Sequence, residues 1–236
     1  MGKGSFFKRG LRDGIPICLG YFAVAFTLGI AAKNAGMTAL QATVTSFLVN
    51  ASAGEFAGFT LIASGAGYVE LAVMMLVANA RYLLMSCALS QKLPKETSIL
   101  HRMLIGFDLT DEIFGVSVSV PGQLNPFYVY GVIAAALPGW SLGTCLGVLM
   151  GNILPANIVS ALSVGLYGMF IAIIIPPAKK DKVIAGVVAI SMALSYFAGK
   201  AQFLQRFSSG TLIIILTVLI SGVAAVLFPI KEEANE

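Results

Sequence analysis

Hydrophobic residues dominate eight stretches of the chain, and polar residues gather in the short segments between them. The stretches fall at about 14–33, 39–63, 69–89, 102–120, 126–150, 157–176, 183–199 and 211–229. Most of them approach the roughly 20 apolar residues that a helix needs to cross a bilayer. The pattern therefore predicts an all-α polytopic membrane protein.

The second stretch, 39–63, is interrupted in its middle, which reads NASAGE from Asn50 to Glu55. A carboxylate in hydrocarbon costs roughly 2.5–3.5 kcal/mol even on lenient insertion scales. Irregular backbone at membrane depth is tolerated only where it is buried in protein or lines a cavity. We therefore expect two half-helices that meet near Ala53–Gly54, return to the same side of the membrane and form the floor of a substrate site.

The distribution of Lys and Arg favours broken segments. If every stretch crosses once with the N-terminus inside, Lys92, Lys95 and Arg102 fall outside, against the tendency of basic loops to stay cytoplasmic. A re-entrant 39–63 moves this loop inside, and a second re-entrant segment at 153–176 keeps the basic residues of 179–182 inside. We expect about six full spans and two broken segments in the cytoplasmic (inner) membrane, with both termini in the cytoplasm.

A weak internal repeat points the same way. Thr27-Leu28-Gly29 and Ser141-Leu142-Gly143 are 114 residues apart, and at this offset the first break falls near Gly165. Counting 102–120 as one span makes the number of crossings between the repeats odd, so the repeats are expected to be inverted, as in many transporters. The expected parts of this single transmembrane domain are a first repeat at about 14–90, a linking span at about 102–120, a second repeat at about 126–200 and a final span at about 211–229.

Composition supports a membrane protein and narrows its chemistry. The 236 residues are 58% hydrophobic and only 11% charged, with a mean hydropathy of +0.89, whereas soluble domains carry about 25% charged residues. Three scattered cysteines have neither disulfide nor metal spacing. Since GxxxxGK[ST] and HExxH motifs are missing, we expect no enzyme, no cofactor and no metal. The net charge of +4 reflects Lys and Arg that flank apolar stretches, so no nucleic-acid partner is implied.

The interruption in 39–63 supplies the first candidate site residues. Glu55 is interpreted either as a carboxylate that meets a substrate ammonium or carries a proton, or as a residue at a water-exposed helix end. Asn50, Ser52 and Gly54 share the break, and we expect them to contribute to the same substrate site.

Asn79 and Arg81 lie within the third stretch, in the sequence VANARYLL. A guanidinium at that depth stays charged and needs a carboxylate, carbonyl groups or an anionic ligand. One interpretation is an intramembrane pair that fixes helix packing. The other is an arginine that holds a substrate carboxylate or gates access by exchanging partners.

Asp108, Asp111 and Glu112 form the third candidate group, in GFDLTDEIFG. Spacings of three and four would place them on one face of a continuous helix. Three crowded carboxylates cannot all be ionised at low cost, which suits a proton relay or a gate that pairs with Arg81. Alternatively, this face borders the inner headgroup region near Arg102.

The order and spacing of several short motifs resemble the AzlC family, the large subunits of branched-chain amino acid exporters. The matching residues are Gly14-Ile15-Pro16, Gly20-Tyr21, Phe26-x-x-Gly29-x-x-Ala32, Ala53-Gly54-x-Phe56, Asn79-x-Arg81, Leu109-Thr110-Asp111-Glu112, and Gly168-Met169-Phe170-Ile171 before Pro176. The resemblance spans about residues 14–200. It implies export of neutral, branched-chain-like amino acids together with a small membrane partner of the AzlD type. Glu55 departs from the Gln usual in that family and adds a charge or a titratable proton at the expected floor of the site.

Together these observations predict a secondary transporter that works by alternating access around the two breaks, in which Glu55 or the Asp111/Glu112 group either receives the substrate ammonium or exchanges a proton. Half-helix N-termini would attract the substrate carboxylate. The alternative is a channel, or a non-transporting membrane subunit of a larger complex. A scaffold has no need of intramembrane carboxylates, so these residues favour the carrier.

Overall fold

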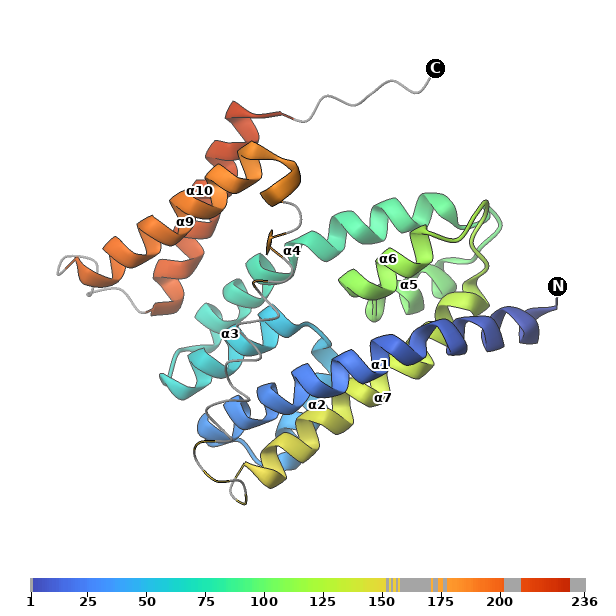
Figure 1. Cartoon of the computed structure of the whole chain (residues 1–236), viewed down its shortest axis with the longest axis horizontal. Coiled ribbons are helices and arrows are strands. Elements are labelled where there is room, and N and C mark those ends of the chain that lie inside the picture. The colour runs from blue at the N-terminus through green and yellow to red at the C-terminus, as the bar shows by residue number, and fades with distance from the viewer. Residues whose placement is uncertain are drawn as a thin grey trace.

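The computed structural model of the chain describes residues 2–151, 153, 155, 157, 171, 174–175, 178–201 and 209–229. Within these residues the secondary structure is helical and contains no strand, which confirms the all-α prediction for that part of the chain (Figure 1). The helices are α1 (Lys3–Asn34), α2 (Ala39–Val49), α3 (Ser52–Ala63), α4 (Tyr68–Lys92), α5 (Ile99–Phe107), α6 (Asp111–Val118), α7 (Pro126–Met150), α9 (Lys182–Lys200) and α10 (Ser209–Leu227). Four of them, α1, α4, α7 and α9, are long and apolar enough to cross a membrane.

The most extensive helix–helix contact in the described part of the chain is between α1 and α7. These two helices lie side by side and run in the same direction (Figure 1). Gly10 lies against Tyr128 near the start of both helices, and Gly147 lies against Phe26 near their ends. A side chain at either glycine would meet the backbone of the other helix. Small residues therefore allow the close backbone approach that favours helix association within a membrane.

Helices α2 and α3 form a hairpin, as expected for the interrupted stretch. Ile62, near the end of α3, lines one cavity with Leu40 and Val44 of α2, so the open end of the hairpin lies beside the C-terminal end of α1. The break lies at Asn50–Ala51, and the prediction of Ala53–Gly54 is wrong. Asn50 ends α2 in the left-handed conformation, with φ 40° and ψ 48°, which Asn adopts more readily than most residues. Gly54 instead lies in the first turn of α3.

The stretch 102–120 is also a helical hairpin, so the expected continuous span is wrong. Helix α5 ends at Phe107, and α6 begins at Asp111 after Thr110, whose hydroxyl accepts a 3.3 Å hydrogen bond from Ile113 N. Threonine followed by two carboxylates is a favourable helix start, because it caps the free N–H groups and complements the helix dipole. Asp108 therefore does not share a helix face with Asp111 and Glu112.

The open end of the α5–α6 hairpin lies at the C-terminal end of α4. Lys92 Nζ donates a hydrogen bond to Val118 O at the end of α6, and Arg102 Nη1 donates one of 2.8 Å to Ser90 O from the start of α5. The two hairpins thus enter the fold from opposite ends. Their tips meet where Asn50 Nδ2 donates a hydrogen bond to Asp108 Oδ1, level with the middle of α1 and α7.

The expected inverted repeat is not confirmed. Inversion requires 102–120 to count as one crossing, and it requires the first helices of the two repeats, α1 and α7, to run in opposite directions. They run in parallel, which follows naturally if both hairpins return to the side they came from. The expected second break near Gly165 lies outside the described residues.

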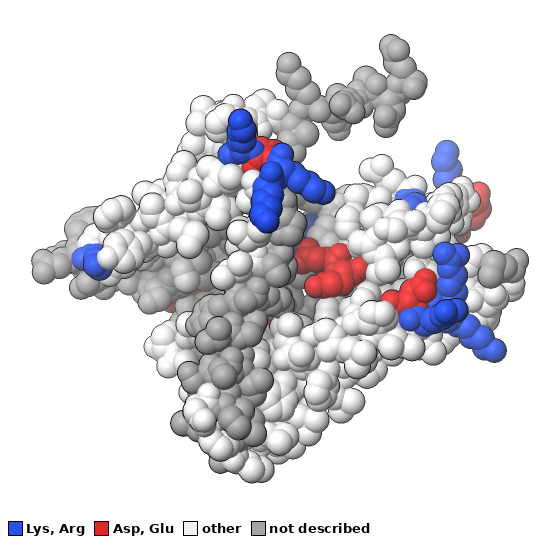
Figure 2. Space-filling view, in the orientation of Figure 1, with Lys and Arg blue, Asp and Glu red and all other residues white. Residues whose placement is uncertain are grey.

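The remaining helices cover one side of this core. Helix α10 packs against α4 and α9, and Thr211 N donates a 2.9 Å hydrogen bond to Glu70 Oε1 at the start of α4. Figure 2 shows acidic side chains grouped near the centre of the viewed face, with one group of basic side chains just above them and others toward the left and right edges.

Candidate functional site

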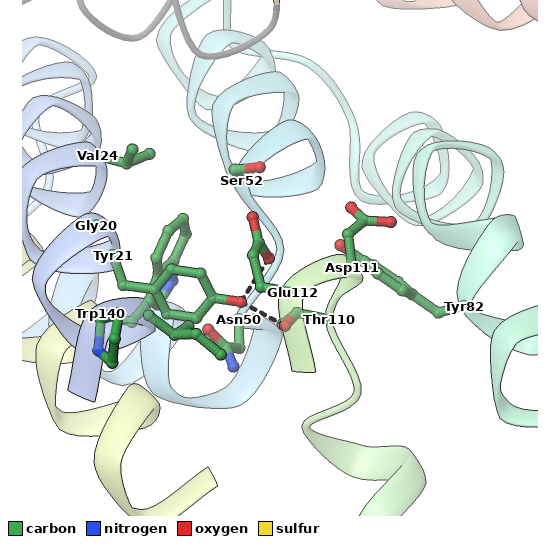
Figure 3. A pocket seen from close by; sticks show the side chains of 12 residues that line it. Gly20, Tyr21, Val24, Asn50, Ser52, Tyr82, Thr110, Asp111, Glu112 and Trp140 are labelled. Carbon is green, nitrogen blue, oxygen red and sulfur yellow. Dashed lines mark hydrogen bonds between the residues drawn. The ribbon is translucent and has the colours of Figure 1, made fainter. Parts of the chain in front are cut away.

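A pocket of about 400 Å³ opens where the hairpin tips meet α1, α4 and α7 (Figure 3). Its size falls within the roughly 300–1,000 Å³ common for small-molecule sites. Its lining residues are Pro16, Ile17, Gly20, Tyr21, Val24, Asn50, Ser52, Tyr82, Thr110, Asp111, Glu112 and Trp140. Three elements that are distant in sequence, α1, the α2–α3 tip and the start of α6, thus supply most of one concave surface.

One wall of the pocket is apolar and aromatic. Tyr21 of α1 and Trp140 of α7 pack edge to face, with ring centroids 5.1 Å apart and an interplanar angle of 69°. Ile17 and Val24 extend this wall along α1. Both rings are almost fully buried, so their orientation is fixed by packing and hydrogen bonding. This wall can accept an aliphatic side chain.

The opposite wall carries carboxylates from the first turn of α6. Tyr21 Oη donates a 2.7 Å hydrogen bond to Glu112 Oε2 and also hydrogen-bonds Thr110 Oγ1 (Figure 3). Since the phenol proton goes to Glu112, Thr110 is the donor to Tyr21. The helix start is thereby tied to the middle of α1. Glu112 and Asp111 leave acceptor oxygens toward the pocket, where they can receive a cationic group.

Arg81 lies at the edge of this acidic wall and forms an ion pair with it. Its Nη2 is 2.8 Å from Asp111 Oδ2, and the two side chains are 41% and 38% exposed. The guanidinium also hydrogen-bonds Tyr82 Oη at 3.1 Å. The expected pairing of Arg81 with a carboxylate is therefore present. Because both side chains are partly exposed, the Arg81–Asp111 ion pair is not a buried contact that serves helix packing alone.

Glu55 does not line the pocket. It is 1% exposed and accepts hydrogen bonds from Trp140 Nε1 (2.7 Å), Ser46 Oγ (2.6 Å) and Ala51 N (3.4 Å). Ser46 is itself the acceptor of a 2.7 Å bond from Thr144. Glu55 thus lies behind Trp140 and fixes both that indole and the α2–α3 break, rather than forming the pocket floor.

Asn79 and Gly54 also lie away from the pocket lining. A Cβ at Gly54 would be 2.7 Å from Asn79 Oδ1, so the glycine allows α3 and α4 to approach closely. Asn50, Ser52, Asp111 and Glu112 line the pocket, whereas Asp108 is buried and hydrogen-bonded to Asn50. The described residues contain no cluster of His, Cys, Asp or Glu suited to a metal.

Among the aromatic lining residues, Tyr21, Tyr82 and Trp140 were not expected at a site from the sequence alone. Trp140 is the only Trp in the chain. A buried indole N–H usually needs a hydrogen-bond acceptor, so a Trp in an apolar stretch indicates that a polar side chain is buried near it. Thr110 precedes two carboxylates in a helix-start pattern. Nothing local marks Tyr82 as a pocket residue.

The fold and site define a helical membrane protein with a binding pocket at the meeting point of two helical hairpins. The profile of the family described as AzlC protein matches residues 16–154. The chain is 31% identical to an uncharacterized membrane protein of Archaeoglobus fulgidus over 83% of this chain and 87% of that protein. It is 24% identical to the inner membrane protein YgaZ of Escherichia coli, over 82% and 86% of the two chains. It is also 25% identical to the branched-chain amino acid transport protein AzlC of Bacillus subtilis, over 75% and 69%.

The chain belongs to the AzlC family. The expected resemblance is therefore confirmed. No solved structure matches the chain.

Proposed function

We propose that this protein is a secondary transporter that exports neutral, branched-chain amino acids by alternating access. The observation that carries the proposal is the pocket between the hairpin tips, which combines an aliphatic and aromatic wall with carboxylates and two helix N-termini. This set of groups complements a zwitterion with an apolar side chain. The name of the Bacillus subtilis relative supports the same substrate class.

In this proposal each part of the substrate has a partner in the pocket. The ammonium is received by Glu112 and Asp111. The carboxylate lies at the N-terminus of α3 near Ser52, where unpaired N–H groups and the helix dipole favour an anion. The side chain packs against Trp140 and Val24. Glu55, Gly54 and Asn79 act as positioning residues that hold the α3 end of the pocket.

The Arg81–Asp111 ion pair is proposed as the gate. When substrate ammonium binds Asp111, Arg81 loses its partner and is free to move with α4. The tips of the two hairpins then provide the thin barrier that opens alternately to either side. Hairpins of this length support that role, because the 12 residues of α3 extend about 18 Å, near half a bilayer.

The proposed location is the cytoplasmic membrane with both termini in the cytoplasm, which the basic residues of the N-terminal segment support. We further propose a small membrane partner of the AzlD type, because the family resemblance implies one. The exposed apolar side chains of α9 and α10 offer surface for such a subunit or for lipid.

Counterflow in proteoliposomes tests the transporter. Vesicles containing the protein, with and without a candidate small partner, are loaded with unlabelled valine and given labelled valine outside. We expect transient, saturable accumulation that falls at least tenfold in Glu112→Gln, since a bond to a charged group contributes about 1.5–3 kcal/mol. Glu96→Gln, the same change at an exposed loop position, is expected to behave as wild type.

Two results would contradict the proposal. Flux that does not saturate and shows no exchange would indicate a channel. No flux with either preparation, across neutral and cationic amino acids, would indicate a non-transporting subunit.

A further inference from the structure

The contact between the hairpin tips leaves two buried oxygens without a donor. Asn50 is 4% exposed and Asp108 is 2% exposed. Asn50 Nδ2 donates a hydrogen bond to Asp108 Oδ1, yet the other atom of each group, Asn50 Oδ1 and Asp108 Oδ2, has no hydrogen-bond partner among the described residues. Unpaired buried oxygens are uncommon and costly in folded proteins.

One proton would satisfy both oxygens. An ionised carboxylate only accepts hydrogen bonds, but a carboxylic acid also has one O–H donor, and a primary amide has both a donor and an acceptor. A carboxylic acid and a primary amide can therefore pair through two hydrogen bonds. Here Asn50 Nδ2 already donates to Asp108 Oδ1, and a proton on Asp108 Oδ2 would donate to Asn50 Oδ1.

The other acidic side chains near the pocket have partners suited to a charged carboxylate. Asp111 pairs with Arg81, Glu112 accepts from Tyr21, and Glu55 accepts from three donors. Asp108 has one neutral donor and, within the described part of the chain, no salt bridge. A buried charge without such partners is expensive, so Asp108 is the carboxyl group best suited to bind a proton.

We propose that Asp108 is the proton-binding site of this transporter and that the Asn50–Asp108 pair couples proton binding to movement of the hairpin tips. The inference rests on the proposed transport function and deepens it. When the proton leaves for water, Asn50 Oδ1 and Asp108 Oδ2 are both acceptors without a donor, and the pair is weakened. Asn50 forms this contact, and Thr110 follows Asp108 by two residues in the chain. Both residues also line the pocket, so separation of the tips changes substrate binding directly.

A pH dependence that arises from Asp108 must be distinguished from effects of the other ionisable groups on the helices that surround the Asn50–Asp108 pair. These groups include Tyr21 of α1, Glu55 of α3, Arg81 and Tyr82 of α4, His101 and Arg102 of α5, Asp111 and Glu112 of α6, and Tyr128 and Tyr130 of α7. Helix α2 contains no ionisable residue. Variants that change only Asp108 or Asn50 separate the pair from this background.

Two transport assays on proteoliposomes of the full chain test the proposal. Counterflow of valine at equal pH reports exchange, and valine accumulation under an imposed pH gradient, with the membrane potential clamped, reports coupling. For one proton per valine, a gradient of one pH unit should give wild-type accumulation of up to about tenfold. Asp108→Asn mimics the protonated acid and can keep both bonds to Asn50. We expect it to retain counterflow within about threefold of wild type and to lose gradient-driven accumulation, while Glu96→Gln retains both.

The outcomes separate this inference from the transport function itself. Absence of wild-type counterflow counts against transport. Wild-type counterflow combined with normal gradient-driven accumulation in Asp108→Asn overturns the proton site alone, as does accumulation driven by a Na⁺ gradient and indifferent to pH. If Asp108→Asn does not fold, a pH-indicator dye in weakly buffered detergent solution still tests the wild type. Valine-dependent proton release or uptake is expected, and its absence overturns the inference.

Discussion

Trp140 Nε1 donates a 2.7 Å hydrogen bond to Glu55 Oε1, joining the middle of α7 to the first turn of α3. The indole forms part of the pocket wall, whereas the carboxylate lies behind it. Any disturbance of Glu55 therefore reaches the pocket through the orientation of Trp140. This relationship connects a carboxyl group beside a helix break to the pocket wall, although the carboxyl group does not line the pocket.

Replacing Glu55 with Gln should preserve folding and transport. The Gln oxygen can accept from Trp140 and Ala51, and its amide can donate to Ser46, which then donates to Thr144. We expect a stability change below about 1 kcal/mol and transport near the wild-type rate. The measurements are the unfolding midpoint in detergent and valine counterflow.

Glu55→Leu is the contrasting variant. It leaves buried donors at Trp140, Ser46 and Ala51 unpaired, at about 1–3 kcal/mol for each, so a clear loss of stability is expected. If Glu55→Gln folds normally but does not transport, the negative charge itself is used and the positioning role assigned to Glu55 is wrong.

Gly54→Ala should crowd the Asn79 side chain of α4 and displace it. The new methyl group would lie 2.7 Å from Asn79 Oδ1 and 2.9 Å from Asn79 Nδ2, and overpacking of this kind costs about 1–3 kcal/mol. A lowered unfolding midpoint is expected, with partial recovery in the Gly54→Ala, Asn79→Ala double variant. Gly186→Ala in α9 meets nothing within 4 Å and should not lower the midpoint. Equal effects of the two single substitutions would contradict the close-approach role.

The sequence predicts the existence of the α2–α3 break but not its position. A polar run ending in Glu55 inside an apolar stretch is a local signal that needs no knowledge of the fold. The position depends on tertiary contacts: Asn50 turns into the left-handed region where it meets Asp108, while Gly54 is needed inside the helix beside Asn79.

The α5–α6 break has a local signal in the sequence, although the prediction of a continuous span over 102–120 is wrong. Thr110-Asp111-Glu112 is a helix-start signature, yet the hydrophobic run around it favours a continuous span. The pocket itself depends on contacts that no local pattern encodes. Tyr21 reaches Thr110 across 89 residues of sequence, and Trp140 reaches Glu55 across 85.

Val24→Leu should shift substrate preference toward smaller amino acids. Val24 extends the apolar wall of the pocket, so one added methylene takes the space of a substrate carbon, worth about 1–3 kcal/mol in such a site. The affinity for leucine is expected to fall at least tenfold relative to alanine in competition counterflow. Val226→Leu, on an 80% exposed side chain of α10, serves as the control. An unchanged leucine-to-alanine ratio would show that the side chain binds elsewhere.

Arg81→Ala should abolish efflux while leaving the protein folded. The Arg81–Asp111 pair is substantially exposed, and such pairs contribute only about 0–1 kcal/mol to stability, so the unfolding midpoint should hardly move. Transport should fall at least tenfold, because Asp111 loses the partner that substrate ammonium displaces. Arg9→Ala removes a comparable exposed arginine beside Asp13, far from the pocket, and should leave transport intact. Normal efflux by Arg81→Ala would contradict the gating role. Partial recovery of transport in the Arg81→Asp, Asp111→Arg double variant would show that this role depends on the ion pair.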